Sequence, residues 1–192
     1  MESLSIDKTK TALVIIDLQK GIVERPSEPY SSDSVVANAA KLADGFRKCG
    51  MPVFLVHVTP SIDMKDGLKP VSDEPMPARQ ITTEWSEIVP ELGPKPEDFV
   101  ITKRQWGAFY GTELDLQLRR RGIDTIVLCG ISTNIGVEST ARFAYEYGYN
   151  QIFAEDAMTA HSKEGHNATV KLIFPRIGRV RKTEEILQEL EL

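Results

Sequence analysis

Three groups capable of chemistry stand at the ends of apolar runs in the sequence. Asp17 ends "TALVIID", Lys103 ends "DFVITK", and the turn "GISTNIG" overlaps the end of "TIVLCG". Such apolar runs are typical of strands buried on both faces of a parallel sheet. In these sheets, sites form outside the carboxyl ends of the strands. We therefore expect a carboxylate, an ammonium group and a turn of backbone amides in one crevice, where they could move a proton or hold an anion.

The turn "GISTNIG" follows a strand and precedes a helix, which is where hydrolases often place a nucleophile. Gly136 stands where the nucleophile is expected, and glycine has no side chain that could attack. Each group also has a plainer interpretation. Asp17 could cap a turn, Lys103 could be solvated, and Cys129 could be an inert buried thiol. The placement of three such groups at three strand ends favours a site.

The elements that must position these groups alternate along the chain. The predicted strands are 11–17, 52–58, 98–103, 125–130, 151–156 and 177–183. Apolar spacing and capping residues predict helices at about 36–46, 113–121 (with Thr112 as its cap), 137–148 and from 183 onward. This alternation predicts a doubly wound α/β fold, a Rossmann-like three-layer arrangement of a six-stranded parallel sheet with helices on both faces. We expect residues 1–192 to form one domain.

The connection 59–97 is too long for a simple link between two strands. It carries seven prolines and little periodicity apart from a short predicted helix at about 82–89. Such segments are usually functional loops or subunit contacts. We expect it to cross the interface of a homo-oligomer, a dimer or tetramer, with Trp85 near the mouth of the crevice. Arg79 is a candidate clamp for a substrate carboxylate, with a solvated arginine as the alternative.

Composition narrows the class of protein further. The net charge of −5 argues against nucleic acid and anionic membranes as partners, and the basic cluster 119–122 suits the end of a helix. The polar N-terminus and the lack of a long apolar run predict a cytoplasmic protein. Cys49 and Cys129 fit a reducing compartment. His161 and His166, five residues apart, do not share a helical face, so neither a metal site nor another cofactor is expected.

Three segments together resemble the signature blocks of a known family. "ALVIIDLQKG", "KRQWGAFYGTEL" and "VLCGISTNIGVESTARFA" are similar in order, spacing and strand context to the isochorismatase-like hydrolases, also called the cysteine hydrolase superfamily, and in particular to its YecD-like branch. The family's triad is aspartate, lysine and cysteine, and Asp17 and Lys103 match the first two. The cysteine position of the pattern G-x-x-T-x-x-C-V is Gly136 here. The resemblance also implies a cis peptide between Ile131 and Ser132.

Gly136 decides which of the family's two reaction types the resemblance implies, covalent attack by a thiolate or acid catalysis. Amidase members attack a carbonyl with the thiolate, which Gly136 cannot do, and Cys129 lies seven residues earlier, inside the strand. The histidine ligands of the metal-dependent nicotinamidases are missing, and His57 is interpreted as core or crevice lining. Isochorismatases proper carry glycine here and hydrolyse a vinyl ether, which calls for an acid and water but no covalent intermediate.

The resemblance therefore implies a hydrolase that acts on a small, anionic metabolite with Asp17 as the general acid. Lys103 would orient Asp17 or hold a substrate carboxylate, and the backbone amides of Ser132 and Gly136 would hold an anion at the start of a helix. The remaining candidates for contact with the substrate are Gln19, Trp106, Phe109, Thr133 and Arg79. The alternative function is that of a non-catalytic small-molecule binding protein, which kept the fold after losing the cysteine.

Overall fold

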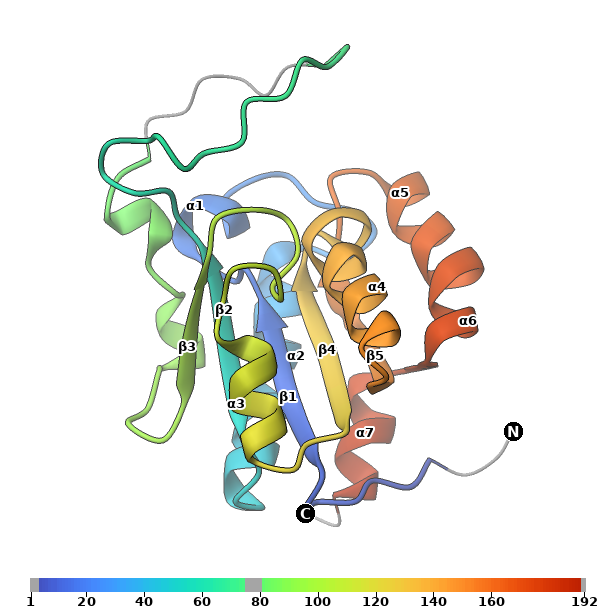
Figure 1. The fold of residues 1–192 in the computed structure, drawn as a ribbon. Coiled ribbons are helices and arrows are strands. Elements are labelled where there is room, and N and C mark those ends of the chain that lie inside the picture. Colours follow the sequence, from blue (N-terminus) through green and yellow to red (C-terminus); the bar gives the residue numbers. More distant parts are fainter. Residues whose placement is uncertain (1–3, 75–80, 191–192) are drawn as a thin grey trace.

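A six-stranded parallel sheet forms the centre of the computed structural model, which describes residues 4–74 and 81–190 (Figure 1). Its strand order is β3-β2-β1-β4-β5-β6. The strands are β1 (Thr11–Ile16), β2 (Val53–Val58), β3 (Phe99–Lys103), β4 (Thr125–Ile131), β5 (Asn150–Thr159) and β6 (Arg179–Arg181). This is the order of a doubly wound fold, and the predicted fold class is confirmed.

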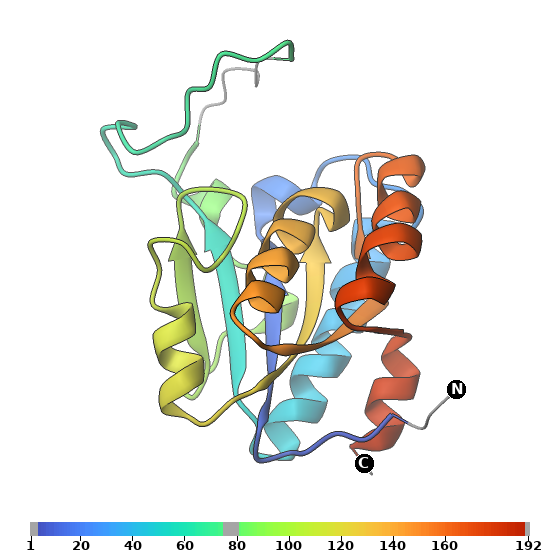
Figure 2. The same ribbon diagram turned by 45° about the vertical axis from the view of Figure 1, so that its right-hand side comes forward.

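Helices cover both faces of the sheet (Figures 1 and 2). On one face lie α2 (Ser32–Lys48) and α7 (Thr183–Glu189), and on the other lie α3 (Leu114–Arg120), α4 (Glu138–Glu146) and α6 (Phe174–Ile177). The shorter elements are α1 (Lys20–Val23), η1 (Glu84–Ser86), η2 (Pro90–Leu92), the π-helical turns η3 (Thr133–Val137) and η4 (Thr169–Ile173), and α5 (Lys163–Ala168). None of the helices within 4–74 and 81–190 is long and apolar enough to cross a membrane.

The apolar runs of the strands feed two cores, one on each face. Along β1, Leu13 and Ile15 pack under α2, while Val14 and Ile16 face the opposite core with α3 and α4. Every residue of β1 is buried. The near-continuous apolar run is therefore a consequence of burial on both sides.

The site depends on the junction between β1 and β4, where the strand order reverses. Ile16 pairs with Gly130, whose φ is +120°. A Cβ atom on Gly130 would lie 2.0 Å from the backbone oxygen of Ile16, so only glycine fits this close approach. The pairing brings the residues after β1 and β4 to the same edge of the sheet.

The structure departs from the sequence-based expectation in several places, of which three are the largest. The helix predicted at 82–89 is replaced by the short 3₁₀ turns η1 and η2, with Pro90 at the start of the second. Strand β5 is longer than predicted and its register with β4 shifts between Leu128 and Gly130. The helical stretch 163–177 was not predicted, because its apolar residues are few and Pro175 and two π-helical turns interrupt any regular spacing.

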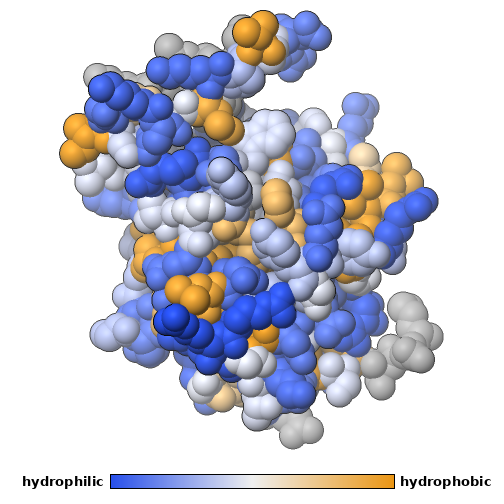
Figure 3. Space-filling model, in the orientation of Figure 1, coloured by the Kyte–Doolittle hydropathy of each residue, from blue (hydrophilic) through white to orange (hydrophobic). Residues whose placement is uncertain are grey.

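The segment after β2 extends away from the body of the molecule before the chain returns to η1 (Figures 1 and 3). In the space-filling view this extension carries apolar side chains among polar ones. Ile62 and Val71 are fully exposed there. Arg79 lies outside the described residues.

Candidate active site

Asp17 follows β1 at the carboxyl edge of the sheet and has an unusual backbone conformation. Its φ is +53°, in the left-handed region that residues other than glycine rarely adopt. The Asp17 N–H donates to the backbone oxygen of Val56 at 2.8 Å, which holds this conformation against the end of β2. Strained backbone of this kind is concentrated at functional sites. The carboxyl group is buried, with only 5% of the residue exposed.

Lys103 reaches Asp17 from the edge strand β3. Its backbone pairs with Val58 in β2, and its side chain crosses the end of β2. The ammonium group donates to Asp17 Oδ2 at 2.7 Å and to the backbone oxygens of Gln105 at 3.0 Å and Trp106 at 2.9 Å. All three ammonium hydrogens are therefore used within the chain. Of the two roles considered for Lys103, this geometry supports the orientation of Asp17 and leaves no donor for a substrate carboxylate.

The protonation of Asp17 is set by two opposed effects. Burial raises the pKa of its carboxyl group to about 6, although the charge and the hydrogen bond of Lys103 lower it. The second carboxyl oxygen, Oδ1, is buried and has no hydrogen-bond partner among the described residues. Because Oδ2 accepts from Lys103, a proton on this carboxyl group belongs on Oδ1. Asp17 thus combines an unoccupied buried oxygen with a pKa close to neutrality.

The turn after β4 closes the site on its other side. The peptide between Ile131 and Ser132 is cis, and the Ser132 oxygen accepts from the N–H groups of Ile135 and Val137. A Cβ atom on Gly136 would lie 3.2 Å from Asp17 Oδ2 and 3.4 Å from the Trp106 oxygen. Position 136 therefore adjoins the Asp17–Lys103 pair directly, and glycine leaves the space beside the carboxyl group free.

The sequence and the fold of this chain are shared with known proteins. The sequence profile of the isochorismatase domain matches residues 11–185. The chain belongs to the isochorismatase family. It is 57% identical over 193 residues to the uncharacterized isochorismatase family protein YwoC of Bacillus subtilis (strain 168), with 100% of both chains covered. It is 56% identical to the uncharacterized YecD of Escherichia coli O157:H7, with 97% of this chain and 100% of YecD covered.

A solved structure of the family has the same fold. An isochorismatase family protein from Burkholderia thailandensis matches with a TM-score of 0.94 and 47% identity, covering 98% of each chain. The isochorismatase family includes hydrolases of different kinds. Proteins similar to this chain include a probable isochorismatase of Pseudomonas chlororaphis, at 29% identity, and the N-carbamoylsarcosine amidase of Thermoplasma acidophilum, at 28%. Membership therefore gives a hydrolase fold and leaves the substrate open.

The structure places two of the expected substrate contacts of this isochorismatase-family protein among packed groups. The buried side-chain amide of Gln19 donates to the oxygens of Val58 and Trp85 and accepts from the Val58 N–H at 2.8 Å, so it ties α1 to β2 and η1. The Phe109 ring packs in the core against Tyr147 and Tyr149, where α4 ends and β5 begins. Both side chains are buried and contact other parts of the chain.

The remaining candidates occupy different surroundings. Trp106 contributes its backbone oxygen to Lys103, while 54% of the residue is exposed. Thr133 is fully buried, and its hydroxyl group contacts the His166 ring instead of solvent. Trp85 covers α1, since a Cβ atom on Gly21 would overlap its ring.

A hollow of about 1060 Å³ lies under the segment that follows β2, on the η1 side of the sheet. His57, Ser86 and Ile88 line it, whereas neither Asp17 nor Lys103 does. The His57 Nδ1 atom donates to the Ser86 oxygen at 2.9 Å and its Nε2 lies 2.8 Å from the Thr102 hydroxyl oxygen, so both ring nitrogens are occupied. The hollow is therefore separate from the Asp17 carboxyl group, whose Oδ1 is buried and has no hydrogen-bond partner among the described residues.

Proposed function

We propose that this isochorismatase-family protein is a hydrolase that acts on a small anionic metabolite by general-acid catalysis from Asp17, with a vinyl ether as the favoured bond. One observation carries the proposal. Asp17 presents a buried, unpartnered Oδ1, and burial raises the pKa of its carboxyl group to about 6. A general acid works best when its pKa lies near the working pH. Asp17 meets that condition, which an ordinary exposed aspartate does not.

The reaction proceeds in steps that form no covalent bond between the substrate and the protein. Asp17 Oδ1 gives its proton to the enol carbon of the vinyl ether, which leaves a cation on the carbon that carries the ether oxygen. Water adds to that carbon and returns a proton to Asp17. The hemiketal then separates into a ketone and an alcohol. Lys103 keeps the carboxyl group in one orientation throughout, through its bond to Oδ2.

The absence of a thiol beside Asp17 supports this route over covalent catalysis. Gly136 leaves space at the position that adjoins the carboxyl group. Cys129 is fully buried within β4, and burial raises the pKa of its thiol far above the usual range. A thiol that stays protonated is a poor nucleophile.

The turn after β4 supports the proposal that the substrate is an anion. Ser132 and Gly136 lie at the start of the continuous helical stretch formed by η3 and α4. The first N–H groups of a helix lack intrahelical partners, and the helix dipole favours negative charge there. A carboxylate on the substrate would be attracted to this end of the site.

The test is turnover of a panel of vinyl ethers, amides, carbamates and esters by the wild type and by Asp17→Asn. Asparagine keeps the shape but supplies no acid proton, so we expect kcat to fall at least about a hundredfold while the ligand still binds. Asp124→Asn, whose carboxylate accepts from the Thr125 hydroxyl near the start of β4, is the matched control. Equal rates for the wild type and Asp17→Asn would show that Asp17 is not the acid.

The same panel separates this proposal from a non-catalytic binding protein. A binding protein should turn over none of the four substrate classes. Its affinity for a ligand should then respond to Asp17→Asn only through the lost charge.

A further inference from the structure

A buried chain of hydrogen-bonding side chains lies behind the turn that follows β4. The Thr133 hydroxyl oxygen is 2.9 Å from His166 Nδ1, and His166 Nε2 is 3.3 Å from Glu155 Oε1. Thr133 begins η3, His166 lies in α5 and Glu155 lies in β5. Thr133 and His166 are completely buried. The proposed chemistry uses none of these three side chains, although Thr133 is the residue next to Ser132.

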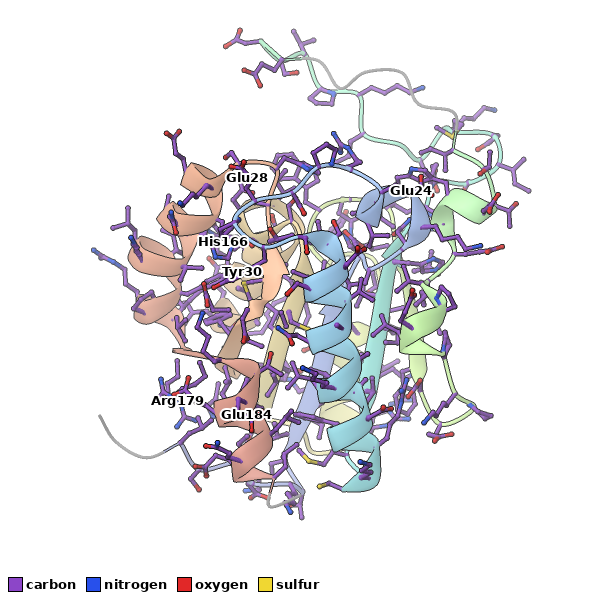
Figure 4. The ribbon with its side chains drawn as sticks, turned by 180° about the vertical axis from the view of Figure 1, so that it is seen from behind. Glu24, Glu28, Tyr30, His166, Arg179 and Glu184 are labelled. Atoms are coloured by element: carbon purple, nitrogen blue, oxygen red, sulfur yellow. The ribbon has the colours of Figure 1, made fainter. Side chains whose placement is uncertain are left out.

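The Glu155 end of this chain is firmly held. Tyr30 donates to both carboxylate oxygens, at 2.9 and 3.1 Å, and Lys182 forms an ion pair with Oε2. Figure 4 shows Tyr30 beside His166, and their rings meet edge to face with centroids 5.8 Å apart. Burial raises the pKa of Glu155, but the hydrogen bonds from His166, Lys182 and Tyr30 lower it to about 2. Glu155 is therefore an anion near neutral pH.

The position of Glu155 results from the irregular pairing of β5. Leu128 pairs with Phe153 and Gly130 with Met158, so β5 has more residues than β4 between these two pairs. Glu155 lies within that bulge. Bulges redirect side chains and are common next to active sites. Here the Glu155 carboxylate of the bulge lies beside His166 of α5.

The hydrogen bonds fix the direction of the chain. A carboxylate can only accept, so His166 Nε2 carries the hydrogen that faces Glu155. In the tautomer with hydrogen on Nε2 only, Nδ1 accepts a hydrogen bond from the Thr133 hydroxyl, so both contacts of the ring are satisfied at once. This is the direction that the proposal below uses.

Close packing joins α5 to the same turn independently of these hydrogen bonds. A Cβ atom on Gly165 would lie 2.7 Å from Asn134 Nδ2, so α5 and η3 are in tight contact. The Ser162 side chain caps α5 and accepts from the Gly165 N–H at 3.1 Å. Helix α5 is thus a rigid support against which the first turn of η3 rests.

We propose that His166 is a positioning residue for the active site, because it holds the Thr133 hydroxyl and thereby fixes the turn in which Gly136 adjoins Asp17. The effect on catalysis rests on the proposed function. The effect on the turn itself does not, and it can be measured without a substrate.

Two substitutions of His166 test its two hydrogen bonds separately, because each keeps one bond and removes the other. In His166→Asn the side-chain oxygen can replace Nδ1 and accept from Thr133, while the contact with Glu155 is lost. In His166→Gln the amide nitrogen can replace Nε2 and donate to Glu155, while the contact with Thr133 is lost. Both variants should fold, because Glu155 keeps Tyr30 and Lys182. Thr133→Val removes the hydroxyl from the other side, and Thr133→Ser restores it.

The first measurement is hydrogen exchange of the backbone in peptides that cover 130–137. We expect faster exchange in His166→Gln and Thr133→Val, and exchange close to wild type in His166→Asn and Thr133→Ser. His161→Asn is the control, since His161 is exposed and its ring forms a hydrogen bond with the Pro26 oxygen, away from Thr133. A loss of stability alone would not distinguish asparagine from glutamine at position 166. Equal exchange in the two His166 variants would overturn the proposal.

The second measurement is the kinetics of the same variants on the substrate found for the wild type. A displacement of reacting groups by about 1 Å can cost about a hundredfold in rate, so we expect His166→Gln and Thr133→Val to lower kcat by about ten- to a hundredfold. His166→Asn should stay within about threefold of wild type, because its oxygen still holds Thr133. A kcat of His166→Asn as low as that of His166→Gln would overturn the proposal.

The third measurement is ¹⁵N NMR of the histidine rings, which should show His166 with hydrogen on Nε2 only. Hydrogen on Nδ1 would overturn the proposed direction of the chain. If the wild type turns over no substrate, the proposed function fails, while the exchange pattern and the ring signals still decide whether His166 positions the turn.

Discussion

Lys103 opposes the effect of burial on Asp17, so removal of its charge should move the pKa of Asp17 upward. Lys103→Met keeps an unbranched apolar side chain but removes the ammonium group that lies 2.7 Å from Oδ2. Burial, the largest cause, already raises the pKa of Asp17 to about 6 in the wild type, and Lys103 lowers it. An opposite charge at this distance lowers the pKa of a carboxyl group by about 1–3. We expect the pKa of Asp17 in Lys103→Met to exceed about 6 by a similar amount.

The same substitution should change how stability depends on pH. In the wild type the pKa of Asp17 is higher in the folded state than its ordinary value of 3.8, so the free energy of unfolding falls as the pH rises from about 4 to about 6. A rise of about 2 in pKa corresponds to about 3 kcal/mol. In Lys103→Met this fall continues to higher pH, at roughly 1.4 kcal/mol per pH unit until the new pKa is passed. The stability gap to the wild type should therefore widen between pH 6 and 8.

Lys103→Met should also lower the free energy of unfolding by an amount that does not depend on pH. The backbone oxygens of Gln105 and Trp106 each lose a donor, at about 1–3 kcal/mol for a buried group. Urea denaturation at pH 5 and pH 8 measures both parts, and ¹³C NMR titration of the aspartate carboxyl groups, assigned with Asp17→Asn, measures the pKa directly. Lys95→Met, which removes an exposed lysine from a loose ion pair with Asp44, is the control. A pKa of Asp17 at or below about 6 in Lys103→Met, or a constant stability gap, would refute the reasoning.

Other features of the site and surface can be perturbed in the same way. Alkylation of Cys49 and the substitution Cys129→Ala should leave turnover intact, because neither thiol adjoins Asp17; loss of activity in a folded Cys129→Ala protein would contradict acid catalysis. Gly136→Ala places a Cβ atom 3.2 Å from Asp17 Oδ2. Crowding of about 1 kcal/mol or more should lower kcat/KM by roughly fivefold or more, while the circular dichroism spectrum stays unchanged. Unaltered kinetics would mean that substrates do not use this side of Asp17. The fully exposed Ile62 in the extension after β2 leads us to expect a homo-oligomer, and sedimentation as a monomer at micromolar concentration would contradict that expectation.

The sheet and its two central site residues were predictable because their signals are local. Apolar runs locate buried strands, and parallel strands end at one edge, so Asp17 and Lys103 were expected to meet there. The contact at 2.7 Å agrees with that expectation. The sequence could not decide whether burial or Lys103 controls the pKa of Asp17, since that depends on how completely the side chains around it exclude water.

The less local parts of the site were not predictable. Gln19 is a polar residue two positions after Asp17, and only the path of the chain through η1 shows that its amide is used by backbone groups. His166 was considered only as a metal ligand, because its partner Thr133 is 33 residues away and Glu155 lies in a bulge. Glu155 in the run "QIFAED" was the one available signal, and it was interpreted as the end of a strand.

The fit of Gly130 against Ile16 has a consequence for how this kind of protein can evolve. The space for a side chain at position 130 is occupied by backbone, so any replacement would force apart the two strands that end at Asp17 and at the turn. At position 136 a Cβ atom would lie 3.1–3.4 Å from its nearest neighbours, so a small side chain there needs shifts of only a few tenths of an ångström. New substrates can therefore be acquired by exchanging the residues around the carboxyl group. The junction that holds them in place has no alternative sequence to explore, and it must be inherited unchanged.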